Sequence, residues 1–175
     1  MAGGSTRARL LAAARDLVVA GSGPLPSAGA VAARAGVSRL TVYHHFGSHA
    51  GLLQAVAEST RPQSVRATSG PPVQRVRATV EAACARWAGD PTLFRRLPDA
   101  TSGESSLAHE LASALGQADQ LRPGCSLKEA EDVITLVTSF AAFDGLHHDG
   151  RRSPAAVAEI LVRMAASILA TQSYP

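Results

Sequence analysis

Apolar residues recur at helical spacing along most of this 175-residue chain, and no stretch keeps the apolar–polar alternation that is typical of strands. In residues 6–20, Leu10, Ala14 and Leu17 share one face, and Arg15 lies on the opposite one. A Gly-Ser-Gly-Pro segment then ends the predicted helix. The pattern predicts an all-α fold.

Three shorter helices are predicted to follow, each opened by a serine that suits the N-cap position. They span residues 28–35 after Ser27, residues 39–46 after Ser38 and residues 49–59 after Ser48. Gly36 and Gly47 end the first two of these helices. Two short helices joined by a tight turn predict a helix-turn-helix, which in DNA-binding proteins places its second helix in the major groove.

Residues 61–72 are rich in Pro, Ser, Gly and Thr, which indicates a link between domains. We therefore predict two domains: a helix-turn-helix domain over residues 1–60 and a helical domain over residues 61–175. Five helices are expected in the second domain, at 73–88, 91–97, 105–121, 127–147 and 154–172. The last two are apolar over more than half of their circumference, so they need burial on more than one side. A second copy of the chain would supply that surface; the alternative is that both are central core helices.

Composition narrows the class of protein. Hydrophobic residues make up 46%, which excludes a disordered chain, and aromatic residues only 4%, which favours helices over sheets. No apolar run reaches the roughly 18 residues of a membrane span, and the N-terminus lacks a signal-peptide pattern. Cys84 and Cys125 form neither a disulfide framework nor a metal-site pattern. We expect a cytoplasmic protein without cofactor, metal or membrane partner.

The positive charge is concentrated in the first third of the chain. Residues 1–61 hold six arginines against Asp16 and Glu58, a net charge of +4, whereas the rest of the chain carries −1. This asymmetry favours a polyanionic partner for the N-terminal third.

The stretch from Ala32 to Ser48 reads AARAGVSRLTVYHHFGS. It resembles the signature of the TetR family of transcriptional regulators, in which an Ala-x-x-Ala-Gly-Val turn leads into a recognition helix that ends in Tyr-x-His-Phe. The resemblance extends from Thr6 to about Ser59. It implies an N-terminal three-helix DNA-binding domain and a C-terminal helical bundle that dimerises and often binds a small effector.

Side-chain chemistry agrees with the resemblance. Arg39 can pair bidentately with guanine, and the hydroxyls of Ser38, Thr41 and Tyr43 suit phosphate oxygens. The resemblance implies base contacts at Arg39, Leu40 and His44. It implies phosphate contacts at Thr41, Tyr43, His45 and His49. The full set of candidate DNA contacts comprises Ser27, Ser38, Arg39, Leu40, Thr41, Tyr43, His44, His45 and His49.

Three positions depart from the family pattern. His49 stands where the family usually has a lysine, and histidine is mostly neutral at pH 7. Gly29 stands where a side chain often reaches DNA, and Ser22-Gly23 replaces a glycine followed by an aromatic residue. We expect fewer DNA contacts per subunit than is usual in the family. Two alternatives stay open here: a packing role for Tyr43 and a metal site at the histidines, although no carboxylate or cysteine is close to them in sequence.

The second domain is expected to dimerise through residues 127–147 and 154–172. The residues that could line an effector pocket there, or simply form the core, are Cys84, Trp87, Phe94, Phe140, Phe143 and His147. The sequence thus predicts a dimeric repressor that a small molecule releases from operator DNA. Alternatives are an effector-independent regulator or activator, a protein-interaction module, and an enzyme, although no catalytic motif is evident.

Overall fold

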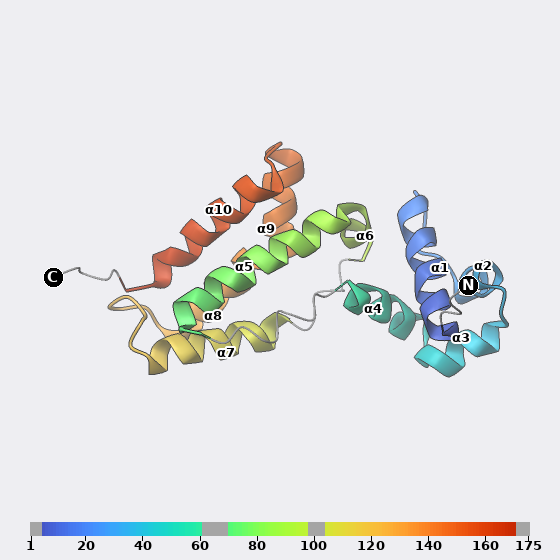
Figure 1. Ribbon diagram of the computed structural model, residues 1–175, viewed down its shortest axis with the longest axis horizontal. Helices are drawn as coiled ribbons and strands as arrows, with labels where there is room; N and C mark the ends of the chain where they lie inside the picture. Colours follow the sequence, from blue (N-terminus) through green and yellow to red (C-terminus); the bar gives the residue numbers. More distant parts are fainter. Residues whose placement is uncertain (1–4, 61–69, 98–103, 171–175) are drawn as a thin grey trace. The chain divides into compact units, whose positions relative to one another are not determined.

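The computed structural model describes residues 5–60, 70–97 and 104–170. These residues are almost entirely helical, and their only β-type pairing is an isolated antiparallel bridge between Leu121 and Leu169. The predicted all-α fold is confirmed. Contacts divide the described residues into two compact units: residues 5–60 with 90–97 form unit 1, and residues 70–89 with 104–170 form unit 2 (Figure 1).

Unit 1 contains α1 (Thr6–Ala20), α2 (Ala28–Ala35), α3 (Arg39–Phe46), α4 (His49–Ser59) and α6 (Pro91–Arg96). The serine caps that the sequence predicts are present. The side chains of Ser27, Ser38 and Ser48 accept hydrogen bonds from the backbone N–H groups three residues later. These bonds satisfy amide groups that a helix start otherwise leaves unpaired.

The core of unit 1 is built around α1, which contacts α2, α4 and α6. The buried residues of α1 are Leu10, Ala13, Ala14 and Val18. They pack in one cluster with Val31 and Ala32 of α2, Val42 of α3 and Leu52 of α4. Because Val42 is completely buried, it fixes which face of α3 turns away from the domain.

The turn between α2 and α3 depends on Gly36, which adopts the left-handed conformation with φ 65° and ψ 41°. The N–H of Val37 bonds to the carbonyl oxygen of Ala32 (3.0 Å), as in a common type of helix C-terminus. Arg9 of α1 donates to the carbonyl oxygen of Ala35, so a cation faces the negative end of α2. These bonds set the direction in which α3 leaves α2.

Helix α6 packs within unit 1 although it follows α5 in sequence. Asp90 caps α6 through Leu93 N–H (3.3 Å), and its other oxygen accepts bonds from Arg15 Nε (3.2 Å) and Nη2 (3.1 Å). Arg96, at the other end of α6, donates to the carbonyl oxygen of Gly23. Residues 91–97, which the sequence pattern assigned to the second domain, thus make their contacts with the first.

Unit 2 comprises α5 (Pro72–Gly89), α7 (Glu104–Gln117), α8 (Leu127–Val137), α9 (Phe140–Asp144) and α10 (Pro154–Ala165). Helix α5 lies between α7 and α10 and also contacts α9, while α7 packs along α8 (Figure 1).

The single helix predicted over residues 127–147 is interrupted, so that prediction was wrong. Helix α8 ends at Val137, and Ser139 caps α9 by accepting a bond from Ala142 N–H (3.2 Å). Trp87 Nε1 of α5 donates to the carbonyl oxygen of Thr138 (3.3 Å). A backbone carbonyl group at the break thus has a hydrogen-bond donor from α5. A π-helical turn, Gly145–Asp149, then follows α9.

Two other predicted helices are shorter than expected. The helix predicted over 154–172 ends at Ala165, and a 3₁₀ turn, Ala166–Ile168, leads into the extended Leu169 that pairs with Leu121. The helix predicted over 105–121 ends at Gln117, shortly before Asp119 adopts a positive φ of 53°. In both cases backbone pairing between the two segments replaces the last helical turn: Ala170 N–H bonds to the carbonyl oxygen of Gln120 (2.9 Å).

Two glycine-to-alanine substitutions in unit 1 should have opposite effects on stability. A Cβ at either Gly36 or Gly29 would meet no atom closer than 3.7 Å, so backbone conformation decides the outcome. Gly36→Ala should lower the free energy of unfolding by about 1–2 kcal/mol because of its positive φ. Gly29→Ala, inside α2, should raise it by about 0.5–1 kcal/mol. Urea unfolding followed by circular dichroism measures both, and an equal sign for the two would contradict the backbone argument.

Candidate nucleic-acid interface

Helix α3 presents one exposed face outside the buried side that Val42 marks. Leu40 is 77% exposed although it is apolar, and Arg39, His44 and His45 are exposed as well. Thr41 and Tyr43 are half-buried at the edge of this face. An apolar side chain that projects from a short basic helix is suited to contact with a thymine methyl group in a major groove.

Arg39 and Tyr43 form a pair one turn apart on α3. The Nε and Nη2 atoms of Arg39 donate to the Tyr43 hydroxyl oxygen at 3.3 Å and 2.9 Å, and the guanidinium carbon lies 5.4 Å from the ring centroid. A hydroxyl oxygen that accepts these bonds still has its own hydrogen to donate. The pair therefore offers guanidinium donors for a base edge and a hydroxyl donor for a phosphate.

The serine and threonine hydroxyls of the candidate site are partly occupied. Ser38 Oγ accepts the Thr41 amide bond and also lies 2.8 Å from Thr41 Oγ1. Ser27 Oγ accepts from Ala30 N–H at 3.2 Å. Ser27 keeps a hydroxyl hydrogen that it can donate to a phosphate while it caps α2. Ser38 and Thr41 share one hydrogen bond between their hydroxyls, so one of the two hydroxyl hydrogens is left for a phosphate.

The ring of His49, expected to contact a phosphate, is hydrogen-bonded within unit 1. Its Nε2 atom donates to the carbonyl oxygen of Pro26 (2.8 Å), which joins the start of α4 to the segment before α2. A neutral imidazole has a single N–H, and this bond uses it. Neutral His49 therefore has no ring donor left for a phosphate. Sequence reasoning missed this contact, since no local pattern signals a bond across 23 residues.

The residues considered for an effector pocket separate into two groups. Phe94 belongs to α6 in unit 1, where it is buried. In unit 2, successive ring centroids along the series Trp87, Phe140, Phe143 and His147 are 5.5, 6.4 and 5.1 Å apart. Trp87 and Phe143 are fully buried. Phe140 and His147 are only partly buried, so the four rings form a series that runs from the core of unit 2 to its surface.

Cys84 of α5 is also part of the interior of unit 2. It is 2% exposed, and burial, aided by the charge of Glu81, raises the pKa of its thiol to about 11. Cys125 is more accessible, and its thiol pKa is also raised, chiefly by desolvation.

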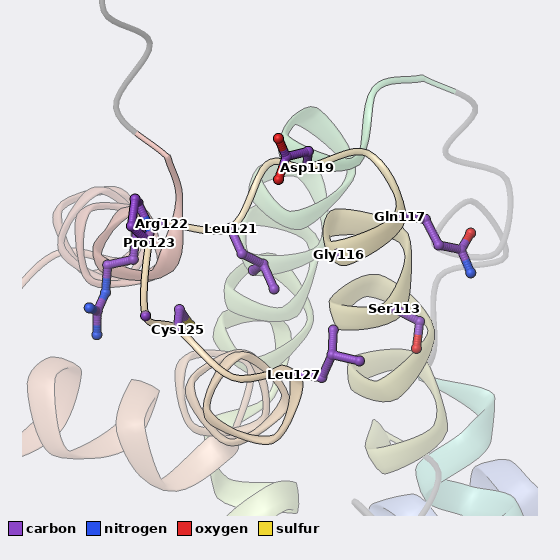
Figure 2. Close-up of a pocket in the computed structure, with 10 residues that line it drawn as sticks. Ser113, Gly116, Gln117, Asp119, Leu121, Arg122, Pro123, Cys125 and Leu127 are labelled. Atoms are coloured by element: carbon purple, nitrogen blue, oxygen red, sulfur yellow. The ribbon is translucent and has the colours of Figure 1, made fainter.

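An open pocket of about 610 Å³ lies elsewhere in unit 2, at the turn between α7 and α8. Figure 2 shows Leu121 pointing toward its centre, while Gln117 and Arg122 point away. The candidate effector residues do not line it. The residues that do are Ser113, Gly116, Gln117, Asp119, Leu121, Arg122, Pro123, Gly124, Cys125 and Leu127. Pro123-Gly124 is a turn signal in the sequence and does not by itself indicate a pocket.

The described residues hold neither a cluster of metal-binding side chains nor a membrane-spanning helix. Across residues 5–60, 70–97 and 104–170, no group of three or more His, Cys, Asp or Glu side chains is arranged to hold a metal ion. No helix in these ranges is both long and apolar enough to cross a membrane.

The helix-turn-helix with its exposed α3 face, joined to a second all-helical unit, defines a class of DNA-binding regulators. Residues 10–56 match the family described as bacterial regulatory proteins, tetR family. This part of the chain is accordingly a TetR-family DNA-binding domain. No curated protein matches the sequence.

Solved structures extend the likeness in fold to almost the whole chain. NalD of Pseudomonas aeruginosa, the secondary repressor of the MexAB-OprM multidrug efflux pump, superposes with a TM-score of 0.71 at 19% identity, over 97% of this chain and 98% of that one. The regulator FadR of Bacillus subtilis, in complex with stearoyl-CoA, gives 0.66 at 12% identity, over 92% and 98%. A putative tetR-family regulator from Shewanella sp. PV-4 gives 0.64 at 18% identity, over 96% and 100%.

The two cysteines should differ sharply in reactivity. With a thiol pKa of about 11, only about one Cys84 in a thousand is a thiolate at pH 8, and the thiolate is the reactive form. Alkylation of the folded protein at pH 8, read by mass spectrometry with Cys84→Ser and Cys125→Ser as matched variants, should label Cys125 first. Labelling of Cys84 should become fast only in denaturant. Equal rates in the folded state would mean that the interior of unit 2 is open at α5.

Proposed function

We propose that this chain is a sequence-specific transcriptional regulator that inserts α3 into the major groove of an operator. The observation that carries this proposal is the exposed face of α3, on which Arg39 and the 77%-exposed Leu40 project from a helix anchored by Val42. The N-terminal residues of a recognition helix contact base edges, and these two residues occupy that end of α3.

We assign the candidate residues to two kinds of contact. Arg39, Leu40 and His44 read bases, with the Arg39 fork suited to guanine. Phosphate contacts, which fix position and carry no sequence information, come from Ser27, Ser38, Thr41, Tyr43 and His45. The same role is proposed for His49, but only when its ring is protonated, because the neutral ring has given its N–H to Pro26.

We also propose that the chain acts as a homodimer formed by the elements within residues 127–147 and 154–172. Leu136 of α8 and Met164 of α10 support this, because they are 53% and 43% exposed and apolar. A second copy that covers them would remove apolar surface from water. A dimer also supplies two recognition helices for two half-sites about 34–36 Å apart or a multiple of that distance.

The mode of regulation proposed is repression that a small apolar or amphipathic effector relieves. Two proteins of similar fold support it: NalD is a repressor, and FadR of Bacillus subtilis is seen with stearoyl-CoA. An effector lowers DNA affinity only as far as it prefers the conformation that does not fit DNA. We place the effector and dimerisation functions in residues 61–175 and DNA binding in residues 1–60, with α6 in contact with the latter. An effector-independent regulator or activator is the alternative.

Removing the proposed base contact should cost DNA affinity and selectivity together. For a duplex selected by the wild-type protein from a random library, Arg39→Ala should weaken binding by about 5- to 150-fold, the range of one bidentate base contact. Tyr43→Phe should weaken it by about 3- to 10-fold because one hydroxyl bond is removed. Fluorescence anisotropy against selected and scrambled duplexes measures both effects. Arg77→Ala in α5, whose exposed side chain pairs with Glu81, is the control. Unchanged affinity for Arg39→Ala would refute the assignment.

Dimerisation should be sensitive to charge on the exposed apolar side chains of unit 2. Leu136→Asp and Met164→Asp each place a carboxylate where the partner chain would bury it without a counter-charge. We expect both variants to stay folded and to shift to the monomer mass in sedimentation equilibrium, with weaker DNA binding. Val19→Asp in α1, at a position 37% exposed, is the matched control and should leave the mass unchanged. A dimer that survives both changes would place the interface elsewhere.

Thiol labelling distinguishes the two places where an effector could bind. A compound that enters the packed interior of unit 2 should alter the labelling rate of Cys84 and the emission of Trp87, the only tryptophan of the chain. A compound in the open pocket should protect Cys125 alone, since Cys125 lines that pocket. An effector of either kind must also lower the anisotropy of bound operator DNA.

A further inference from the structure

Arg7 lies in the first turn of α1, outside the set of DNA contacts suggested by the sequence. Its guanidinium carbon is 5.1 Å from the centroid of the Phe46 ring, the last residue of α3. The face of an aromatic ring attracts a cation electrostatically, so this contact holds the guanidinium beside the C-terminal end of the recognition helix. Phe46 itself is half-buried and packs against the core of unit 1, which makes it a firm support.

The other described arginines before α4 have protein partners that take up their guanidinium donors. Arg9 binds the carbonyl oxygen of Ala35, Arg15 binds Asp90, Arg34 binds Asp16 and Arg39 binds the Tyr43 hydroxyl. Within the part of the chain that the structure describes, Arg7 is exposed and has no ion pair with a carboxylate. Contact with a ring face leaves the N–H groups at the edge of a guanidinium available for an oxygen ligand.

The surroundings of Arg7 favour an anion. His44 and His45 are exposed in the same last turn of α3, and the rings of His45 and Phe46 are 6.2 Å apart. Arg7 belongs to α1 and reaches only the last residue of α3, whereas the proposed base contacts Arg39, Leu40 and His44 come from α3 itself. A planar guanidinium fork at that position matches the oxygens of a backbone phosphate.

We propose that Arg7 binds a DNA backbone phosphate at the C-terminal end of the recognition helix, and that Phe46 is the residue that positions it. This inference rests on the proposed DNA-binding function. It adds a contact that reads no sequence, and it compensates for the missing lysine at position 49, where the His49 ring is committed to Pro26.

Salt dependence is the decisive measurement. Arg7→Ala should weaken binding to selected and scrambled duplexes by the same factor and leave the ratio of the two affinities unchanged. The slope of log K against log salt should become less steep by about 0.9 for each phosphate that is no longer neutralised, or about 1.8 for a dimer. Arg7→Lys, which keeps the charge, should retain most of the slope. Arg77→Ala, at an exposed position in α5 outside the proposed dimer elements, is the control and should change nothing.

The positioning role of Phe46 is tested by Phe46→Leu, which keeps an apolar side chain but removes the ring face. In a double-mutant cycle with Arg7→Ala, the effects on DNA affinity should fall short of additivity, because each change removes the same placed cation. The salt slope of Phe46→Leu should also decrease, which packing damage alone would not produce. Circular dichroism melting verifies that each variant is folded.

The outcomes separate the inference from the function on which it rests. If the wild type binds its selected duplex specifically while Arg7→Ala keeps the same affinity and slope, the Arg7 contact is refuted and the proposed function stands. If Arg7→Ala lowers only the preference for the selected duplex, Arg7 reads a base and the phosphate assignment is wrong. If the wild type prefers no sequence, the proposed function itself fails.

Discussion

The left-handed turn at Gly36 is the constraint on which the DNA-binding unit depends. It changes the direction of the chain between two helices of eight residues each. Helices this short are not stable alone, so their relative direction must come from the turn and from packing. The Val37 amide bond to Ala32 closes α2, Ser38 opens α3, and Arg9 ties the junction to α1. Val42 then locks the rotation of α3 about its axis. Because the direction and the rotation of α3 are fixed, the side on which its residues Arg39, Leu40 and His44 project is fixed as well.

Helix α6 extends the same unit from a distant part of the sequence. Asp90 serves two purposes with its two oxygens, since one caps α6 and the other binds Arg15 of α1. Arg96 holds the loop after α1 from the other end of α6. The segment that directly follows α5 is therefore bonded to the helix that carries the core of the DNA-binding unit.

The limits of α1 to α4 could be predicted from sequence because their signals are local. Each serine cap bonds an amide three residues away, and Gly36 stops its helix by its own conformation. The break after Val137 was missed because apolar positions continue through it: Ile134, Val137 and Phe143 are all buried. The Thr138-Ser139 pair was a usable signal, since Ser139 is an N-cap. By contrast, the Arg15–Asp90 bond joins residues 75 apart and the His49–Pro26 bond residues 23 apart, and no local pattern encodes either.

The charge of the first third overstates what is available to DNA. Arg9, Arg15 and Arg34 each face a carbonyl oxygen or a carboxylate of the same unit, so their charge stabilises the fold. The permanent cations near α3 are then Arg39 and Arg7. Because few permanent cations neutralise phosphates, the proposed non-specific binding should be weak and have a shallow salt dependence. In the proposed mode of binding, base contacts therefore contribute a large share of the affinity, and one unit offers only three of them, Arg39, Leu40 and His44. Joining two units in the proposed dimer raises the effective concentration of the second at its half-site, which is how a sparsely charged recognition helix gains selectivity without additional arginines.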